Sequence, residues 1–155
     1  MPVQTTYPVA IARQYPGGLA DNNPTRKVTL LSEASVIPYG RAVQQGTDQR
    51  QAKIGTGTTA YLGITVRVHN EENVAAGVDS AQYPEDELMA VMEEGSIFVS
   101  LVTTGTKGNA LYSVDADGTI GAGAPGAGQT AIPGGVLLDT VTAVDQIVKI
   151  RLKSE

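Results

Sequence analysis

Apolar and polar residues alternate in two segments of this chain, as they do in a strand that buries one face. The alternation runs through residues 61–69 and again through residues 147–153. The side chains expected to face the core are Leu62, Ile64, Val66, Val68, Val148, Ile150 and Leu152. Those expected on the outer face are Thr65, Arg67, His69, Lys149, Arg151 and Lys153. Both segments are therefore predicted to be half-buried strands.

Shorter runs of β-forming residues, set apart by glycine, predict further strands at residues 28–31, 41–43 and 136–141. Residues 121–128, with the sequence GAGAPGAG, are expected to form a loop because they carry few side chains that can pack.

Two hairpins are also expected. One joins residues 88–92 to 97–102 across the polar connection EEGS, and the other joins 110–114 to 119–120 across DADG. For residues 85–92 a helix is the competing interpretation, because Pro84 is suited to its first turn. We favour the strand.

The first 27 residues differ from the rest because they show neither a helical nor a strand period. They contain four prolines, and proline removes a backbone donor and restricts the residue before it. They also carry apolar side chains that a solvated tail would lack. We therefore predict an extended arm over residues 1–27 that contacts a partner, followed by a single β domain over residues 28–155. A disordered terminus without a partner is the alternative. The arm residues predicted to bind the partner are Tyr7, Ile11, Arg13, Tyr15, Pro16 and Leu19.

Composition narrows the fold class. A chain of 155 residues suits one domain, and 18 glycines with 8 prolines favour short strands and turns over a helical bundle. Strands at this spacing, without helical patterns between them, predict an all-β fold: a compact β-barrel or β-sandwich with an extended N-terminal arm.

The net charge of −5 argues against a protein that coats nucleic acid. Acidic residues concentrate between Glu71 and Glu94, a stretch with no lysine or arginine, while the C-terminal strand is basic. Such asymmetry suits alignment of neighbouring copies, and a solvated acidic loop explains it equally well. We expect no signal peptide and no membrane span, hence synthesis in the cytoplasm.

Candidate chemistry is sparse. The chain has no cysteine, and its single histidine, His69, has no nucleophile motif to serve. Asp115 and Asp117 match the first ligand positions of an EF-hand calcium loop, but Gly126 occupies the twelfth position, where that loop needs a glutamate. The glycine-rich segments lack the lysine of a phosphate-binding loop, and the catalytic motif of an all-β nucleotide hydrolase is missing. We therefore predict no catalytic residue, no metal site and no cofactor, and hence no enzyme.

The order of short motifs along the chain is specific. The motifs are PGGLAD at residues 16–21, IPYGRAV at 37–43, GT at 46–47, YLGITVR at 61–67, EGSIFV at 94–99, KGNALY at 107–112, GT at 118–119, GVLLD at 135–139 and VKIRL at 148–152. In this order the chain resembles the structural cement, or decoration, proteins of tailed bacteriophage capsids.

The resemblance implies a virion protein without enzymatic activity. It would bind the outer surface of the assembled major-capsid lattice and stabilise it by bridging neighbouring capsomers, with the arm reaching onto capsid subunits. It also implies self-association as a homotrimer, with a dimer as the alternative. Avidity over a repeating shell suits such a role. A virion-surface module that binds a receptor or a glycan is the alternative function, suggested by the acidic and glycine-rich loops.

Overall fold

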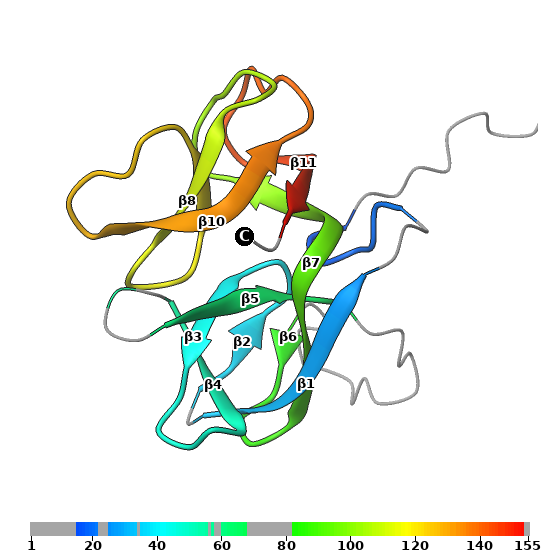
Figure 1. Ribbon diagram of the computed structural model, residues 1–155, viewed down its shortest axis with the longest axis vertical. Helices are drawn as coiled ribbons and strands as arrows, with labels where there is room; N and C mark the ends of the chain where they lie inside the picture. Colours follow the sequence, from blue (N-terminus) through cyan, green and yellow to red (C-terminus); the bar gives the residue numbers. More distant parts are fainter. Residues whose placement is uncertain are drawn as a thin grey trace, which may run out of the picture.

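One long strand, β7 (Leu88–Leu101), runs through both halves of the molecule (Figure 1). The computed structural model describes residues 15–21, 25–33, 35–55, 57, 60–67 and 82–153, and within them the fold is all-β with no helix. The other strands are β1 (Arg26–Ser32), β2 (Ile37–Pro38), β3 (Ala42–Gln45), β4 (Gln51–Ile54), β5 (Tyr61–Thr65), β6 (Gln82–Tyr83), β8 (Ala110–Val114), β9 (Ile120–Ala122), β10 (Gln129–Leu137) and β11 (Gln146–Leu152).

Strand pairing closes two five-stranded rings that share β7. The first ring runs β1-β4-β3-β5-β7 and closes through the antiparallel pairing of β7 with β1. The second runs β7-β11-β10-β8-β9 and closes through a parallel pair, Leu101 with Ile120. Figure 1 shows the first ring in the lower half and the second in the upper half. The predicted all-β barrel is confirmed, and closure gives both end strands of the large sheet, β1 and β9, a second neighbour, which reduces the exposed sheet edges that promote aggregation.

The continuity of β7 contradicts the predicted hairpin and the alternative helix. Residues 88–94 pair with β1 and residues 95–101 pair with β11, so the two halves never pair with each other. Glu93, Glu94 and Gly95 resemble a turn in sequence, yet Gly95 has a φ of 131° and stays within the strand. Long-range pairing on both sides has overridden the local turn signal.

Two apolar clusters fill the rings. The larger extends from Ile64 and Met92 through the second ring, and the smaller lies in the first ring around Val43, Met89 and Val91. Aliphatic side chains supply most of both clusters, as the low aromatic content requires.

Several predicted strands are confirmed. The segment at residues 28–31 lies within β1, the predicted strand at 41–43 corresponds to β3, which begins one residue later at Ala42, and the DADG turn joins β8 to β9 as a hairpin. In β11 the alternation holds, because Val148, Ile150 and Leu152 are buried while Arg151 and Lys153 are exposed.

Other predictions need correction. The strand expected over residues 136–141 is wrong in its bounds, because β10 begins at Gln129 and bends through a register shift between Ala131 and Val136. Thr65 was expected on an outer face but is fully buried, since its hydroxyl donates to the carbonyl of Pro38 at 2.8 Å. The predicted loop is shorter than expected, because residues 121 and 122 belong to β9. Val68 and His69 lie outside the described residues.

Candidate functional site

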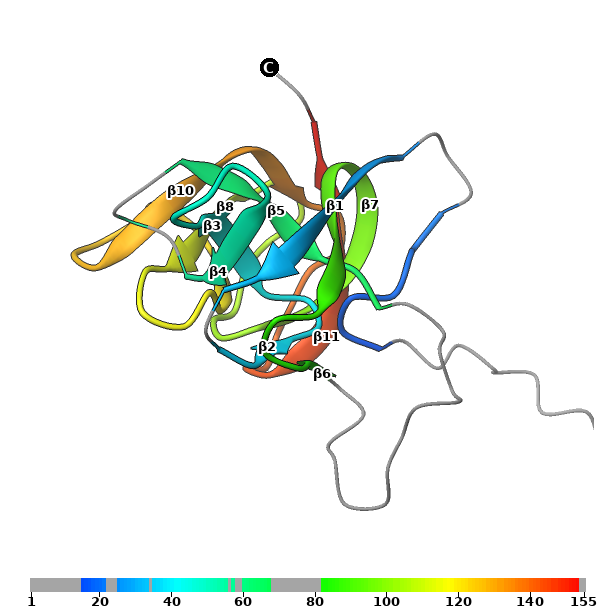
Figure 2. The ribbon, with the colours of Figure 1, turned by 90° about the horizontal axis from the view of Figure 1, so that it is seen from below.

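Within the predicted arm, residues 15–21 lie along the second half of β7, and we call them the tethered segment (Figures 1 and 2), while Arg26 and Lys27 already belong to β1. The amide of Gly17 donates to the carbonyl of Phe98 at 2.7 Å, and the amide of Phe98 donates to the carbonyl of Gly18 at 2.9 Å. Leu19 forms an antiparallel bridge with Ile97. The segment therefore adds a short stretch of pairing to β7 on the side that β11 leaves open.

Two glycines allow this segment to approach the domain. Gly17 and Gly40 have φ values of 79° and 74°, a region that side chains with a Cβ rarely enter. A Cβ on Gly17 would lie 2.9 Å from both the amide nitrogen of Arg67 and the Cβ of Tyr39. The Arg67 amide also donates to the Gly17 carbonyl at 2.8 Å. Glycine at position 17 is thus required by both conformation and space.

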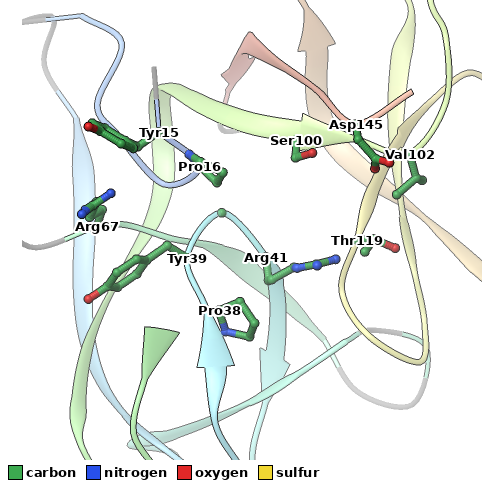
Figure 3. Close-up of a pocket in the computed structure, with 11 residues that line it drawn as sticks. Tyr15, Pro16, Pro38, Tyr39, Arg41, Arg67, Ser100, Val102, Thr119 and Asp145 are labelled. Atoms are coloured by element: carbon green, nitrogen blue, oxygen red, sulfur yellow. The ribbon is translucent and has the colours of Figure 1, made fainter. Parts of the chain in front are cut away.

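The Arg67 side chain holds the start of the tethered segment. Its guanidinium lies 4.4 Å from the centroid of the Tyr15 ring and 5.9 Å from that of Tyr39. A guanidinium over the face of a tyrosine is attracted by the ring and stacks on it. Figure 3 shows both rings beside this guanidinium.

The stack continues inward from Tyr39. Its ring meets that of Tyr83 edge to face, with 4.9 Å between centroids. The Tyr83 hydroxyl donates to the carbonyl of Val66 at 2.5 Å and accepts from the amide of Ala90 at 3.2 Å. Burial raises the pKa of Tyr83 to about 12. Tyr15 at the surface is therefore linked through side-chain contacts to a buried, hydrogen-bonded tyrosine.

An ion pair fixes the other end of the tethered segment. The ammonium of Lys149, on β11, lies 2.5 Å from a carboxylate oxygen of Asp21. The hydrogen bond from Lys149, followed by one from Ser96, lowers the pKa of Asp21 below its ordinary value. The segment is thus held at both ends as well as along its backbone.

A groove of about 330 Å³ opens beside the tethered segment, between the two rings (Figure 3). Its walls come from both rings and from the segment itself. They are formed by Tyr15, Pro16, Pro38, Tyr39, Gly40, Arg41, Arg67, Ser100, Val102, Thr119 and Asp145.

The predicted binding residues fall into two groups. Tyr15 is 38% exposed and Leu19 is 45% exposed, while Pro16 lines the groove. Tyr7, Ile11 and Arg13 lie outside the described residues. Partner binding by all six stays a prediction.

Sequence reasoning missed Arg67 and Tyr39 as parts of this site. Arg67 was assigned only to the outer face of a strand, with no partner. The sequence did offer one signal for this site. Pro16-Gly17 and Tyr39-Gly40 each place a glycine after a rigid or aromatic residue, a pattern typical of tight turns that can pack closely against another segment.

The described residues give no sign of a reactive centre. No group of three or more potential ligands for a metal is found among them, and Asp117 accepts hydrogen bonds from the amide and hydroxyl of Thr119 within its turn. A search of the described part for a long apolar helix that could cross a membrane finds none.

Comparison with known proteins identifies a matching family and solved structures with a similar fold. The model of a family described as structural cement protein (E217 gp24/Pam3 gp6) matches residues 3–153. A solved structure described as the capsid of Myoviridae phage XM1 has a chain with a similar fold, with a TM-score of 0.71, 15% identity and 99% of each chain covered. No curated protein matches the sequence.

Proposed function

Since this chain belongs to the structural cement protein family of phages, we propose that it binds the outer surface of the assembled major-capsid lattice and bridges neighbouring capsomers. The family accounts for a structural role in the virion and for no enzymatic one. The position on the outer surface, the bridging of capsomers and synthesis in the host cytoplasm are the proposal.

The observation that carries the proposal is the tethered segment. Its backbone is fixed to β7, while Tyr15 and Leu19 stay 38% and 45% exposed. Exposed apolar side chains on a fixed backbone lose little entropy when they dock, which favours binding. The predicted arm residues before Tyr15 are proposed to make a second contact on a neighbouring subunit, which would add avidity.

Self-association as a homotrimer, with a dimer as the alternative, is also proposed from the family resemblance. Light scattering on the purified chain measures its mass directly, against 16.1 kDa for the monomer.

Sedimentation with capsids that lack this chain tests the proposed function. The purified chain is expected to pellet with assembled capsids, to saturate, and to raise the temperature at which the capsids release DNA or fall apart. Leu19→Ser should weaken this binding. Leu88→Ser is the matched control, because Leu88 is 69% exposed but lies at the far end of β7. Equal losses in both variants would show that the tethered segment is not the docking surface.

A further inference from the structure

We propose that the groove beside the tethered segment binds an acidic segment of the major capsid protein, with its carboxylates held by Arg67 and Arg41. The identity of the partner rests on the proposed function. The chemistry of the bound segment follows from the side chains that line the groove.

The groove carries two positive charges that no ion pair within the described residues neutralises, and Asp145 contributes one carboxylate to its lining. Ion pairs within the described residues join Arg26 to Glu93 and Lys149 to Asp21, and none involves Arg41 or Arg67. Two guanidiniums therefore face the groove in a protein whose net charge is −5. A local positive site on an acidic protein selects for a negative partner and against copies of itself that present like charge.

The contacts of Arg67 with two tyrosine rings orient its guanidinium before a carboxylate binds. The Arg67 guanidinium lies over the rings of Tyr15 and Tyr39, with its central carbon 4.4 Å and 5.9 Å from the two ring centroids, and it takes part in no ion pair within the described residues. A cation–π contact with a ring face does not use an oxygen acceptor, so the N–H donors of Arg67 stay available to a carboxylate. The stack also reduces the entropy lost when the ion pair forms.

Arg41 extends the positive site along the groove. Figure 3 shows its side chain directed toward Thr119 and away from Arg67. Its charge is felt by Asp117, without an ion pair between the two. Two separated guanidiniums fit an extended segment with two carboxylates better than a single small anion.

The remaining walls define the rest of the bound segment. Pro16, Pro38 and Val102 provide apolar surface, and the hydroxyls of Ser100 and Thr119 offer polar contacts. Asp145 lies at the Arg41 end with a φ of 60°, and its amide donates to the carbonyl of Leu101 at 2.7 Å. Its carboxylate would accept an N–H or O–H donor of the bound segment. A volume of about 330 Å³ holds a few side chains, at the lower end of ligand sites.

Arg41→Gln tests this inference, because Arg41 does not take part in the stack that holds the tethered segment. Arg50→Gln is the matched control, because this substitution removes the same charge from an exposed residue on the turn before β4. Each variant is mixed with capsids that lack the chain, and its dissociation constant is measured at two salt concentrations. We expect Arg41→Gln to bind at least about tenfold more weakly with a reduced salt dependence, and Arg50→Gln to bind like the unmodified chain.

Cross-linking identifies the occupant. The chain has no cysteine, so Thr119→Cys gives a single attachment point for a photoreactive maleimide at the groove. A cross-linked capsid peptide with at least one Asp or Glu is the expected product. A cross-link to another copy of this chain, or to a capsid peptide without a carboxylate, would overturn the inference, as would specific binding of a glycan that Arg41→Gln abolishes.

The outcomes separate this inference from the proposed function. If the unmodified chain fails to bind capsids, the proposed function is wrong. If it binds and both glutamine variants bind equally well, the proposed function stands and the groove is not the acidic-segment site.

Discussion

The guanidinium of Arg67 lies 4.4 Å above the ring of Tyr15, and the amide of the same arginine donates to the carbonyl of Gly17 at 2.8 Å. Arg67, the second residue after β5, thus holds the tethered segment through both its side chain and its backbone. The backbone bond survives any substitution of Arg67 by a residue that keeps its amide. The stack depends on the side chain alone, so the two contributions are separable.

Arg67→Ala is expected to loosen the tethered segment without unfolding the domain. Loss of the stack removes about 0.5–1 kcal/mol of attraction, and Arg67→Lys should restore only part of it, because an ammonium cannot stack as a guanidinium does. Hydrogen exchange at the Gly17 amide measures the effect. Unchanged protection at Gly17 in Arg67→Ala would show that the backbone contacts alone hold the segment.

Gly17→Ala is expected to be more severe. Alanine at this position would have to adopt a φ of 79°, and its Cβ would lie 2.9 Å from the backbone nitrogen of Arg67. The free energy of unfolding should therefore fall by about 1–3 kcal/mol. Gly126→Ala is the control, because the nearest atom to its Cβ is 3.4 Å away and belongs to a side chain. Chemical denaturation compares the two variants. Equal stability in both would contradict the packing described at Gly17.

Replacement of tyrosine by phenylalanine is expected to change the free energy of unfolding in opposite directions at Tyr61 and Tyr83. The Tyr61 hydroxyl is buried and has no hydrogen-bond partner among the described residues, so Tyr61→Phe should raise the free energy of unfolding by about 1 kcal/mol. The Tyr83 hydroxyl bonds to Val66 and Ala90, so Tyr83→Phe should lower it by about 1–3 kcal/mol. Denaturant titration of both variants measures each value. A loss of stability in Tyr61→Phe would reveal a partner for that hydroxyl.

The ion pair of Asp21 with Lys149 predicts a pH dependence. Hydrogen bonds from Lys149 and Ser96 lower the pKa of Asp21 from its ordinary 3.8 in the folded chain. A lowered pKa means that the ionised carboxylate stabilises the folded state above pH 3.8, and that this contribution is lost as the pH falls through the lowered pKa. A carboxyl titration by NMR should place the midpoint of Asp21 below 3.8, and Lys149→Gln should raise it. A midpoint unchanged by Lys149→Gln would contradict the ion pair.

Alternation of apolar and polar residues correctly predicted strands that have one face in the core and the other in solvent. In β11 one face is core and the other is solvent, so Val148 and Arg151 were placed correctly from sequence. Thr65 was misplaced because the turn from Pro38 to Arg41 lies against its side chain, and hydrogen bonds with both of these residues satisfy its buried hydroxyl.

Long-range pairing explains what the sequence could not predict. Glu93 to Gly95 carries a turn signal, and only the pairing of β7 with β1 and β11 decides that the strand continues. The contact of Arg67 with Tyr15 joins residues far apart in the chain and has no periodic pattern. The prediction of a binding segment near Tyr15 and Leu19 came from prolines and unpaired apolar residues, a local signal that needed no knowledge of the fold.

A cryo-electron microscopy reconstruction of capsids decorated with the purified chain tests the central claim most directly. The account predicts density for the double ring on the outer surface, above a junction between capsomers, with the tethered segment facing capsid protein and density continuing from Tyr15 onto a neighbouring subunit. Density confined to the inner surface or to a single subunit, or contact made only through the face opposite Tyr15 and Leu19, would contradict it.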